Sequence, residues 1–183
     1  MLQATVVKDT SELQQILALQ EKNLKQYIDA TEMQQQGFVT MHHTLATLQQ
    51  MHDKAPSVII KDGDAIVAYA LVMLNDCREL VPLLEPMYAN FELLSWQGKP
   101  LYDYRFYVMG QICIDKAYRG QGLFEQLYQA HRDIYGPAYD FIVTEVSVSN
   151  KRSLSAHQRV GFQTINTYRD DTDDWEVVLW DWA

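Results

Sequence analysis

A glycine-rich turn lies between an apolar, β-branched stretch and an amphipathic helix, and it is the part of this chain best suited to chemistry. The turn, residues 119–122, reads Arg-Gly-Gln-Gly and follows the apolar residues 112–114. After it, Leu123, Leu127 and Ile134 recur at helical spacing, which predicts a helix that begins at the turn. The first N–H groups of a helix have no partner inside the helix, and glycines let a ligand approach the backbone closely. The turn therefore predicts a binding site for a phosphate group.

The spacing of the glycines excludes two common phosphate-binding patterns. A dinucleotide-binding fingerprint needs a third glycine at the position of Glu125, and a P-loop needs four residues between its glycines, followed by Lys and Ser or Thr. Neither pattern is present. A glycine pair by itself is also compatible with the plain start of a helix, so a second signal is needed.

Two segments together resemble the GNAT superfamily of acyl-CoA-dependent N-acyltransferases. Residues 117–122 resemble the family signature Gln/Arg-x-x-Gly-x-Gly/Ala, with Ala117 in place of the usual Gln or Arg. Residues 150–162 resemble the second conserved block, which ends in Gly-Phe, with His157 where the family usually has Tyr. The second block is equally compatible with an ordinary helix that Asn150 caps and Gly161 ends, and both interpretations can hold together.

The resemblance implies a fold and an activity. The expected fold is α/β (α+β), with a mixed, mostly antiparallel central sheet flanked by helices. The expected reaction is transfer of an acetyl group from acetyl-CoA to a primary amine, by direct attack in a ternary complex. Two different functions remain open: a regulatory domain that binds acyl-CoA without turnover, consistent with the departures at Ala117 and His157, and a purely structural interaction domain.

The expected coenzyme contacts follow from the turn and from the resemblance. Backbone N–H groups of residues 119–124 would bind the pyrophosphate of acetyl-CoA. By resemblance, the strand edge at residues 112–114 would pair with the pantetheine amides and donate an N–H to the oxyanion of the tetrahedral intermediate. The residues assigned to the coenzyme are Ile112, Cys113, Ile114, Arg119, Gly120, Gln121, Gly122, Leu123, Phe124, Asn150 and Ser153.

Acyl transfer to an amine needs a base, and Glu145 is the first candidate. An alkylamine with a pKa near ~10.4 is almost fully protonated at neutral pH, so a proton must leave before the nitrogen can attack. Glu145 is the one ionisable residue inside the apolar strand expected at residues 139–149, where burial would raise its pKa. A solvated or cross-strand-paired carboxylate is the alternative. Asp103 and Glu92 are weaker candidates for the base.

A proton donor for the departing thiolate is a smaller requirement. The thiol of CoA has a pKa near ~8.5, so protonation helps only modestly. By position in the family block, an imidazolium at His157 would replace the usual phenol, and Tyr128 and Tyr168 are fallback donors. The alternative is that His157 only packs or forms hydrogen bonds.

The acceptor site is expected in the N-terminal half, where Tyr27 and Phe38 would line the cleft. A net charge of −9 favours a cationic acceptor, which could be a small amine, a peptide N-terminus or a protein lysine, and argues against nucleic acid as a partner. Acidic residues near the end of the chain predict a solvated turn or a rim that attracts cations. They are Asp170, Asp171, Asp173, Asp174 and Glu176.

Composition favours a single domain over residues 1–183, because the chain is 48% hydrophobic and contains no Ser-, Gly- or Pro-rich linker. The longest apolar run, residues 65–74, is too short to span a bilayer, and no secretory signal is evident, so we expect a cytoplasmic protein without a membrane partner. Cys77 and Cys113 are expected to be free thiols. No metal site is expected, because the histidines lack ligand spacing.

The hydrophobic pattern predicts the order of the elements. Residues 75–101 are expected to hold a helix inserted between strands three and four, kinked or split at Pro86, with an apolar face for a lid, a dimer contact or core packing. The tryptophans of the final strand could pair across a homodimer or pack inside. Strands are expected at residues 3–8, 57–61, 65–74, 102–115, 139–149, 162–169 and 175–182, and helices after Asp9, with a helical hairpin following, and at 40–53, 122–135 and 153–160.

Overall fold

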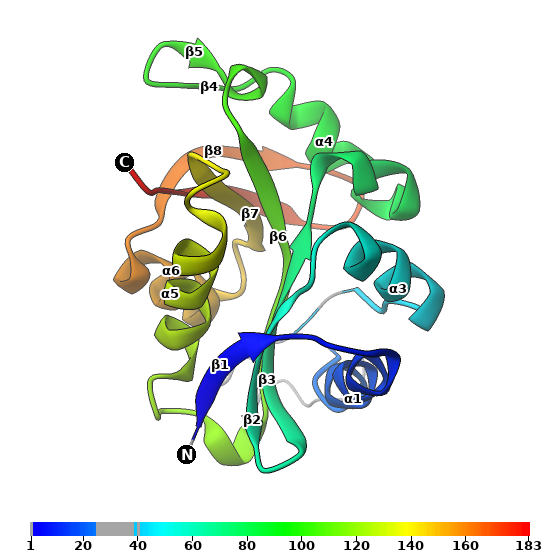
Figure 1. The fold of residues 1–183 in the computed structure, drawn as a ribbon. Coiled ribbons are helices and arrows are strands. Elements are labelled where there is room, and N and C mark those ends of the chain that lie inside the picture. The colour runs from blue at the N-terminus through cyan, green and yellow to red at the C-terminus, as the bar shows by residue number, and fades with distance from the viewer. Residues whose placement is uncertain (1, 25–38, 40) are drawn as a thin grey trace.

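The computed structural model of the chain describes residues 2–24, 39 and 41–183. Its centre is a seven-stranded sheet in which neighbouring strands run antiparallel except for one parallel pair, β6 and β7 (Figure 1). The mixed, mostly antiparallel sheet predicted from the sequence is confirmed. In order across the sheet, the strands are β1 (Gln3–Val6), β2 (Val58–Asp62), β3 (Ala65–Met73), β6 (Phe106–Ile114), β7 (Phe141–Ser147), β9 (Asp174–Asp181) and β8 (Gln163–Arg169).

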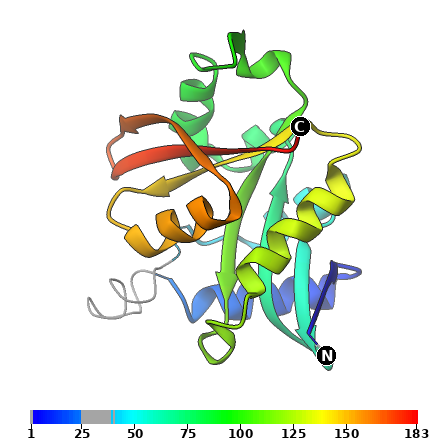
Figure 2. The ribbon, with the colours of Figure 1, turned by 90° about the vertical axis from the view of Figure 1, so that its left-hand side faces the viewer.

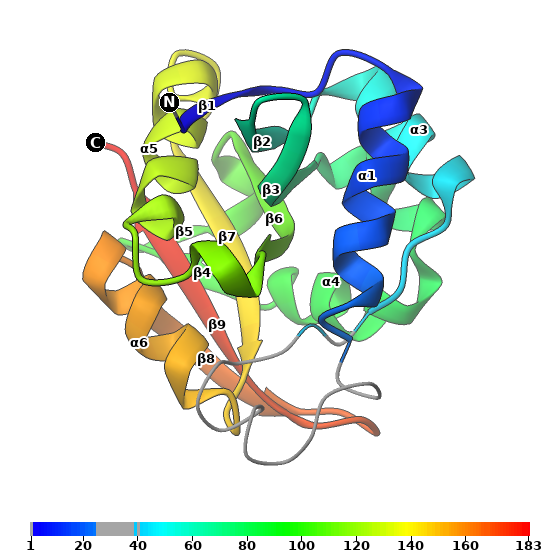
Figure 3. The ribbon, with the colours of Figure 1, turned by 90° about the horizontal axis from the view of Figure 1, so that it is seen from below.

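Helices cover both faces of the sheet. The main helices are α1 (Thr10–Glu21), α3 (Leu45–Lys54), α4 (Glu85–Phe91), α5 (Leu123–Tyr135) and α6 (Lys151–Val160). The first three lie on one face, and α5 and α6 lie on the other (Figure 3). Alternate side chains of β3 divide between the faces: Tyr69 and Leu71 pack in one core, and Ala68 and Ala70 in the other. Because both faces are buried, β3 is a continuous apolar run in the sequence.

Side-chain caps fix the starts of the N-terminal helices. The Asp9 carboxylate accepts the Glu12 N–H at 3.1 Å and begins α1 where predicted. The predicted start of the next helix, near residue 40, is wrong: Thr44 accepts the Thr47 N–H at 3.1 Å, so α3 begins at Leu45. Residues 25–38, to which the expected helical hairpin would extend, lie outside the described residues.

Strands β6 and β7 diverge along their length. They form only three residue pairs, from Phe106 opposite Phe141 to Val108 opposite Val143. Beyond these pairs, β7 continues beside β9 as far as Ser147, and β6 continues beside β3. A shift of register between β3 and β6 lies at the same level, where Ala70 pairs with Ile112 but Val72 pairs with Met109. The C-terminal halves of β6 and β7 therefore open a gap inside the sheet.

The insertion at residues 75–101 is helical, as predicted, but it is divided into several short helices. It contains the 3-10 helices η2 (Asn75–Leu80) and η3 (Pro82–Leu84), α4, and a hairpin of β4 (Ser95–Trp96) and β5 (Lys99–Pro100), followed by η4 (Leu101–Asp103). Pro86 lies in the first turn of α4, where a helix does not need its missing N–H, so it starts the helix and does not kink it. Tyr88 and Phe91 are fully buried in the core, whereas Leu83 is 81% exposed.

The last two strands are joined by a turn that contains Asp170, Asp171 and Asp173, as predicted, whereas Asp174 and Glu176, which were expected in the same turn, lie in β9. The Asp170 carboxylate accepts the N–H groups of Thr172 and Asp173 at 2.7 and 3.0 Å. In β9, Trp180 and Trp182 contact each other edge to face and pack against the core on the α5 side, which favours packing inside over a dimer contact for these two rings. Figure 2 shows this end of the sheet, where α6 connects β7 to β8 along the chain.

Two further observations concern the length of the helices and the state of the cysteines. Within the described residues, no helix has the length and apolar character needed to cross a bilayer. Both cysteines are free and buried, as expected.

Candidate active site

The glycine turn ends at the N-terminus of α5, as the sequence predicted. Gly120 and Gly122 have φ angles of +76° and +77°, a backbone region that side chains other than glycine rarely adopt. Gly122 is the N-cap, and the first intrahelical bond is donated by the Gln126 N–H to its carbonyl at 3.1 Å. The N–H groups of residues 123–125 therefore have no acceptor within the helix and are available to an anion.

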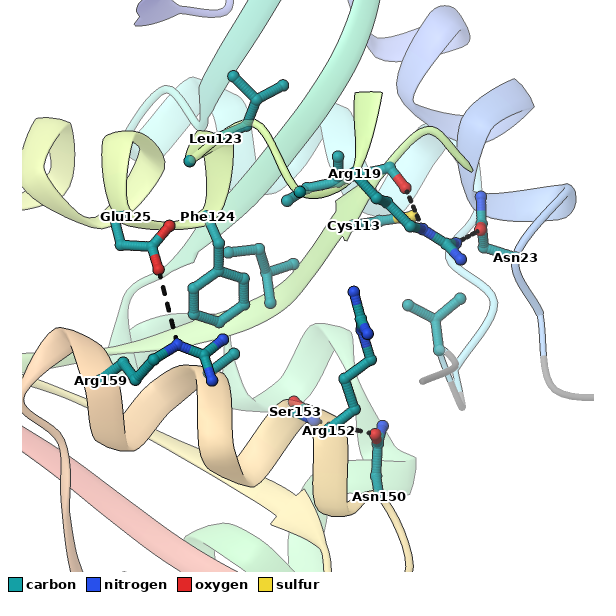
Figure 4. Close-up of a pocket in the computed structure, with 16 residues that line it drawn as sticks. Asn23, Cys113, Arg119, Leu123, Phe124, Glu125, Asn150, Arg152, Ser153 and Arg159 are labelled. Atoms are coloured by element: carbon teal, nitrogen blue, oxygen red, sulfur yellow. Dashed lines mark hydrogen bonds and ion pairs between the residues drawn. The ribbon is translucent and has the colours of Figure 1, made fainter. Parts of the chain in front are cut away.

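The Arg119 side chain braces this turn from inside. Its Nε donates to the Ile114 carbonyl at 3.2 Å, and its Nη2 donates to the Asn23 side chain at 2.5 Å (Figure 4). These bonds tie the turn to the end of β6 and to the segment that follows α1. Arg119 thus contributes its side chain to the shape of the loop, and it also lines the cavity beside the turn.

A cavity of 360 Å³ lies between the turn, β6 and α6. The structure brings together ten of the eleven residues assigned to the coenzyme from the sequence; only Gln121 is absent from the lining, and its side chain donates to the Ala117 carbonyl at 3.4 Å. Sequence reasoning missed Arg152 and Arg159, which project from one face of α6 (Figure 4). Their spacing with Ala156, four and then three residues, is a helical-face pattern that identifies them once the helix is known.

The positive charge of this first cavity comes from three arginines, Arg119, Arg152 and Arg159. Among the described residues of its lining, the one acid is Glu125, which lies 4.0 Å from Arg159. In Figure 4, Arg152 reaches from α6 into the space below the turn. The cavity therefore presents guanidinium groups and unpartnered helix N–H groups to one ligand, which is the donor set that a pyrophosphate needs.

A second cavity, of 470 Å³, lies on the other side of the gap between β6 and β7. Its walls come from β6, β7, the insertion, the segment before α3 and the β8–β9 turn. Four residues line both cavities and mark the place where they meet: Val39, Ile112, Asn150 and Ser153. Two ligands bound in the two cavities would thus approach each other at the diverging strands.

Glu145 lies in the wall of this second cavity and has the raised pKa that the sequence predicted. Burial raises its pKa to about 7, and the negative charge of Asp170 adds to the rise. The Tyr168 hydroxyl donates to Glu145 Oε2 at 2.5 Å, which stabilises the carboxylate and opposes the shift. Glu145 is therefore a partly protonated carboxyl group at neutral pH, with its hydrogen-bond donor already in place.

His157 does not fit the imidazolium acid expected from the sequence. The ring is buried, and burial lowers its pKa to about 4, so it is neutral at pH 7. Its Nδ1 lies 2.8 Å from the Ser153 carbonyl, which can only accept, so Nδ1 carries the hydrogen. Nε2 then accepts from the Tyr128 hydroxyl at 2.6 Å. The expectation fails because a neutral ring with both nitrogens engaged has no proton to give.

The other predicted residues of the catalytic and acceptor sites divide into two groups. Tyr128 and Tyr168, the fallback donors, already donate to His157 and Glu145. Glu92 pairs with Arg78 at 2.6 Å and Asp103 is exposed in η4, and neither lines a cavity, so the structure brings neither to the site. Tyr27 and Phe38 lie outside the described residues. No group of three or more His, Cys, Asp or Glu side chains that could hold a metal ion occurs in the described part of the chain.

The ordinary helix interpretation of residues 150–162 is also correct. The Asn150 side chain accepts the Ser153 N–H at 3.2 Å and caps α6, and Gly161 ends it with φ +120°. A Cβ at Gly161 would approach Trp180 Nε1 to 3.0 Å. The same residues thus build the helix and, at Asn150 and Ser153, line both cavities.

A diverging parallel strand pair, with a basic cavity at a helix N-terminus on one side and a buried carboxyl group on the other, is the arrangement of an acyl-transfer enzyme. The chain belongs to the acetyltransferase (GNAT) family, whose model matches residues 19–162. It is an acyltransferase of the GNAT type, with acetyl-CoA as co-substrate. The family's enzymes act on amine acceptors. No curated protein matches the chain in sequence.

Solved structures share the fold at low sequence identity. The ribosomal-protein-S18-alanine N-acetyltransferase from Escherichia coli has a TM-score of 0.66 at 12% identity, covering 100% of this chain and 95% of its own. An N-acetyltransferase from Staphylococcus aureus Mu50 has a TM-score of 0.63 at 18% identity, covering 100% and 99%. The structure of yncA from Salmonella typhimurium with its cofactor acetyl-CoA has a TM-score of 0.63 at 12% identity, covering 100% and 95%.

Proposed function

We propose that this protein transfers the acetyl group of acetyl-CoA to a primary amine held in the second cavity, by direct attack within a ternary complex. The observation that carries the proposal is the meeting of the two cavities at Ile112, Asn150 and Ser153, with arginines on one side and Glu145 on the other. Donor and acceptor can then react without a covalent enzyme intermediate.

The donor binds along the glycine turn. The pyrophosphate of acetyl-CoA receives the N–H groups of residues 119–124, with Arg152 and Arg159 adding charge from α6. The pantetheine arm follows the C-terminal half of β6 at residues 112–114. It lies along the edge of β6 that is no longer paired with β7. Asn150 and Ser153 contact the arm near the thioester. The thioester carbonyl then lies at the junction of the cavities.

Glu145 acts as the base. With a pKa of about 7, it is deprotonated in a substantial fraction of molecules at neutral pH and accepts the proton that the amine must lose. The amine nitrogen forms a bond to the thioester carbon, and a backbone N–H of residues 112–114 donates to the oxyanion. The C–S bond then breaks and CoA leaves as a thiolate. The nitrogen, which is positively charged after its attack, loses its extra proton to this thiolate, so that the neutral acetamide and the CoA thiol form.

His157 serves as a positioning residue in this scheme. Its Nδ1–H donates to the Ser153 carbonyl, and its Nε2 accepts from the Tyr128 hydroxyl. His157 thereby links the first turn of α6 to α5. Ser153 is thereby kept at the junction of the two cavities.

A regulatory domain that binds acyl-CoA without turnover is the second candidate, and the neutral state of His157 is the observation that favours it, because a neutral ring supplies no acid. Such a domain would bind acyl-CoA in the first cavity but would not transfer the acyl group. The acceptor class within the proposed enzyme is a small amine, a peptide N-terminus or a lysine, and the Escherichia coli neighbour, by its name, acetylates a protein alanine.

Calorimetric titration with acetyl-CoA tests the donor site first. We expect micromolar binding that Arg152→Gln weakens about tenfold, as for loss of one charge-assisted contact. Lys151→Gln is the matched control, because Lys151 is exposed beside Arg152 and does not line the cavity. Thiol release with primary amines then separates the enzyme from the regulatory domain: binding with release supports acetyl transfer, and binding without release supports the second candidate. No binding at millimolar ligand would refute both.

A further inference from the structure

We propose that the acceptor is a carboxylate-free diamine: an amine on an apolar chain whose far end carries a second positive charge. This inference rests on the proposed function and names the acceptor class of the same site. Its evidence is the distribution of charge and apolar surface around the second cavity, which differs from that of the first cavity.

The two cavities carry opposite charge. The first is lined by three arginines and one acid, and the described lining of the second contains three acids, Glu145, Asp170 and Asp173, and no lysine or arginine. His42 also lines the second cavity, but its Nε2 lies 3.4 Å from the carboxylate of Glu21. A ligand with a carboxylate would therefore place a further negative charge among these acids, with no lysine or arginine of the described lining to pair with it, whereas an ammonium group would be attracted.

The two aspartates that line the second cavity, Asp170 and Asp173, are held in fixed positions by hydrogen bonds and form what we call its anionic rim. Asp170 Oδ1 accepts hydrogen bonds from the N–H and hydroxyl of Thr172 and from the Asp173 N–H, at 2.6 to 3.0 Å. These bonds lower the pKa of Asp170 to about 2, so it is ionised at any physiological pH. Asp173 Oδ2 accepts from the Ser147 hydroxyl at 2.7 Å. A preorganised anionic rim of this kind binds a cation without first paying the entropy of ordering its own side chains.

Apolar side chains form another part of the wall of the second cavity. Leu83, Leu84 and Met87 from the insertion, and Val108 and Met109 from β6, line the same cavity. Leu83 is 81% exposed, so it can still gain burial against a ligand. Methylene groups suit this wall, and the buried end of the cavity carries Glu145, the proposed base. The cavity thus matches an amine at Glu145, an apolar stem and a second ammonium group at the Asp170 end.

The second charge would also help the base. The negative charge of Asp170 raises the pKa of Glu145, so an ammonium group bound at Asp170 cancels part of that effect. A diamine would therefore lower the pKa of Glu145 when it binds, and more Glu145 would be deprotonated at neutral pH. A monoamine lacks this effect.

Three amines of equal length test the proposal: pentylamine, 1,5-diaminopentane and 5-aminopentanoate, at saturating acetyl-CoA. We expect kcat/KM from thiol release to be about tenfold higher for the diamine than for pentylamine and about tenfold lower for the amino acid, as for one favourable or unfavourable charge contact in a partly solvated cavity. Equal values for the three amines, or the highest value for the amino acid, would overturn the inference.

Paired variants assign the effect to the rim. Asp170→Asn keeps an oxygen that can accept the bonds of the turn and should reduce the diamine preference to about twofold. Asp171→Asn changes the net charge equally, but Asp171 is exposed and does not line the cavity, so the preference should stay unchanged. An equal loss of preference in both variants would indicate a general charge effect and refute the assignment.

The outcomes also separate this inference from the proposed function. Turnover of pentylamine without preference for the diamine would retain acetyl transfer and refute only the diamine. If no amine is turned over, acetyl transfer to small amines fails, and calorimetric binding of the same three amines to CoA-saturated protein decides the specificity: tighter binding of the diamine supports it, and equal binding refutes it.

Discussion

Replacing Tyr168 with phenylalanine should move the acidic limb of the pH–rate profile to higher pH. The Tyr168 hydroxyl donates to Glu145 Oε2 at 2.5 Å and so favours the carboxylate. Glu145 must be deprotonated to accept a proton, so kcat/KM rises with pH through its pKa of about 7. Removing a donor to the charged form raises that pKa and leaves less active base at neutral pH.

The size of the shift follows from the hydrogen bond. A bond to a charged group contributes about 1.5–3 kcal/mol, which corresponds to about 1–2 pKa units at about 1.36 kcal/mol per unit. Because Tyr168 is only half-buried, water can replace part of the lost hydrogen bond, and the lower end of this range of pKa shifts applies. We therefore expect the midpoint of the limb to move by about one unit, with a rate loss of about tenfold at pH 6.5 and almost none at pH 9.5.

The assay is initial-rate thiol release from acetyl-CoA at subsaturating amine, between pH 5.5 and 9.5. Tyr104→Phe is the matched control, because the Tyr104 hydroxyl donates to the Trp96 carbonyl, away from Glu145. A limb that stays near pH 7 in Tyr168→Phe, with an unchanged fold by circular dichroism, would refute the base role of Glu145. An equal shift in Tyr104→Phe would refute the specific part played by Tyr168.

Three further predictions concern stability and the role of the ring at position 157. Glu145→Gln should raise the free energy of unfolding at pH 9 by up to about 3 kcal/mol relative to the wild type, and much less at pH 4. Folding raises the pKa of this carboxyl group from 4.5 to about 7, so the group stabilises the fold fully below pH 4.5. That contribution is lost as the pH rises through 7. His157→Phe should cost about 1–3 kcal/mol by leaving the buried Tyr128 hydroxyl without an acceptor, yet keep the shape of the pH–rate profile between pH 6 and 8, because the ring is already neutral there. Gly161→Ala should lower stability by about 1–3 kcal/mol, because φ +120° strains any side chain and its Cβ would press on Trp180. Urea unfolding, and thiol release for the profile, measure these effects.

Each of these predictions has an outcome that would contradict it. If the free energy of unfolding changed with pH by the same amount in the wild type and in Glu145→Gln, the pH dependence would not come from the Glu145 carboxyl group. If the change of rate near pH 7 disappeared from the pH–rate profile of His157→Phe, His157 would act as the imidazolium acid after all. For Gly161→Ala, the control is Gly63→Ala, which also has positive φ but open space around its Cβ; equal losses would show that the contact with Trp180 adds nothing.

The sequence predicted the donor side well because its signals are local. The Gly120 and Gly122 turn, the helix that follows and the Asn150 cap depend on residues close together in the chain, so spacing alone locates them. Of the three arginines of the first cavity, Arg152 and Arg159 were missed because a basic residue on an exposed helix is ordinarily solvated. Only the packing of α6 beside the turn gives Arg152 and Arg159 their common direction.

Charge states were the least predictable part of the site. The pKa of Glu145 was anticipated because its apolar neighbours are adjacent in the strand, but its donor Tyr168 comes from β8, across β9. The neutral form of His157 depends on its burial, which arises from ring contacts with Phe124 and Tyr128 of α5 and with Phe162. No spacing rule reports such contacts, so position in a family pattern suggested a role that the surroundings do not allow.

The divergence of β6 from β7 is the feature on which both cavities depend. Had the two strands stayed paired beyond Val108, the β6 backbone at residues 112–114 would be engaged with β7 and could not pair with a pantetheine arm. The shift of register against β3 turns Gln111 toward α1, where its side chain accepts from Gln20 and Tyr69 and donates to the Met41 carbonyl at 2.7 Å. That network holds the segment before α3 against β6 as a wall of the acceptor cavity. One irregular strand therefore exposes backbone to the donor and fixes the boundary of the acceptor, which is why the two ligands can meet at its edge.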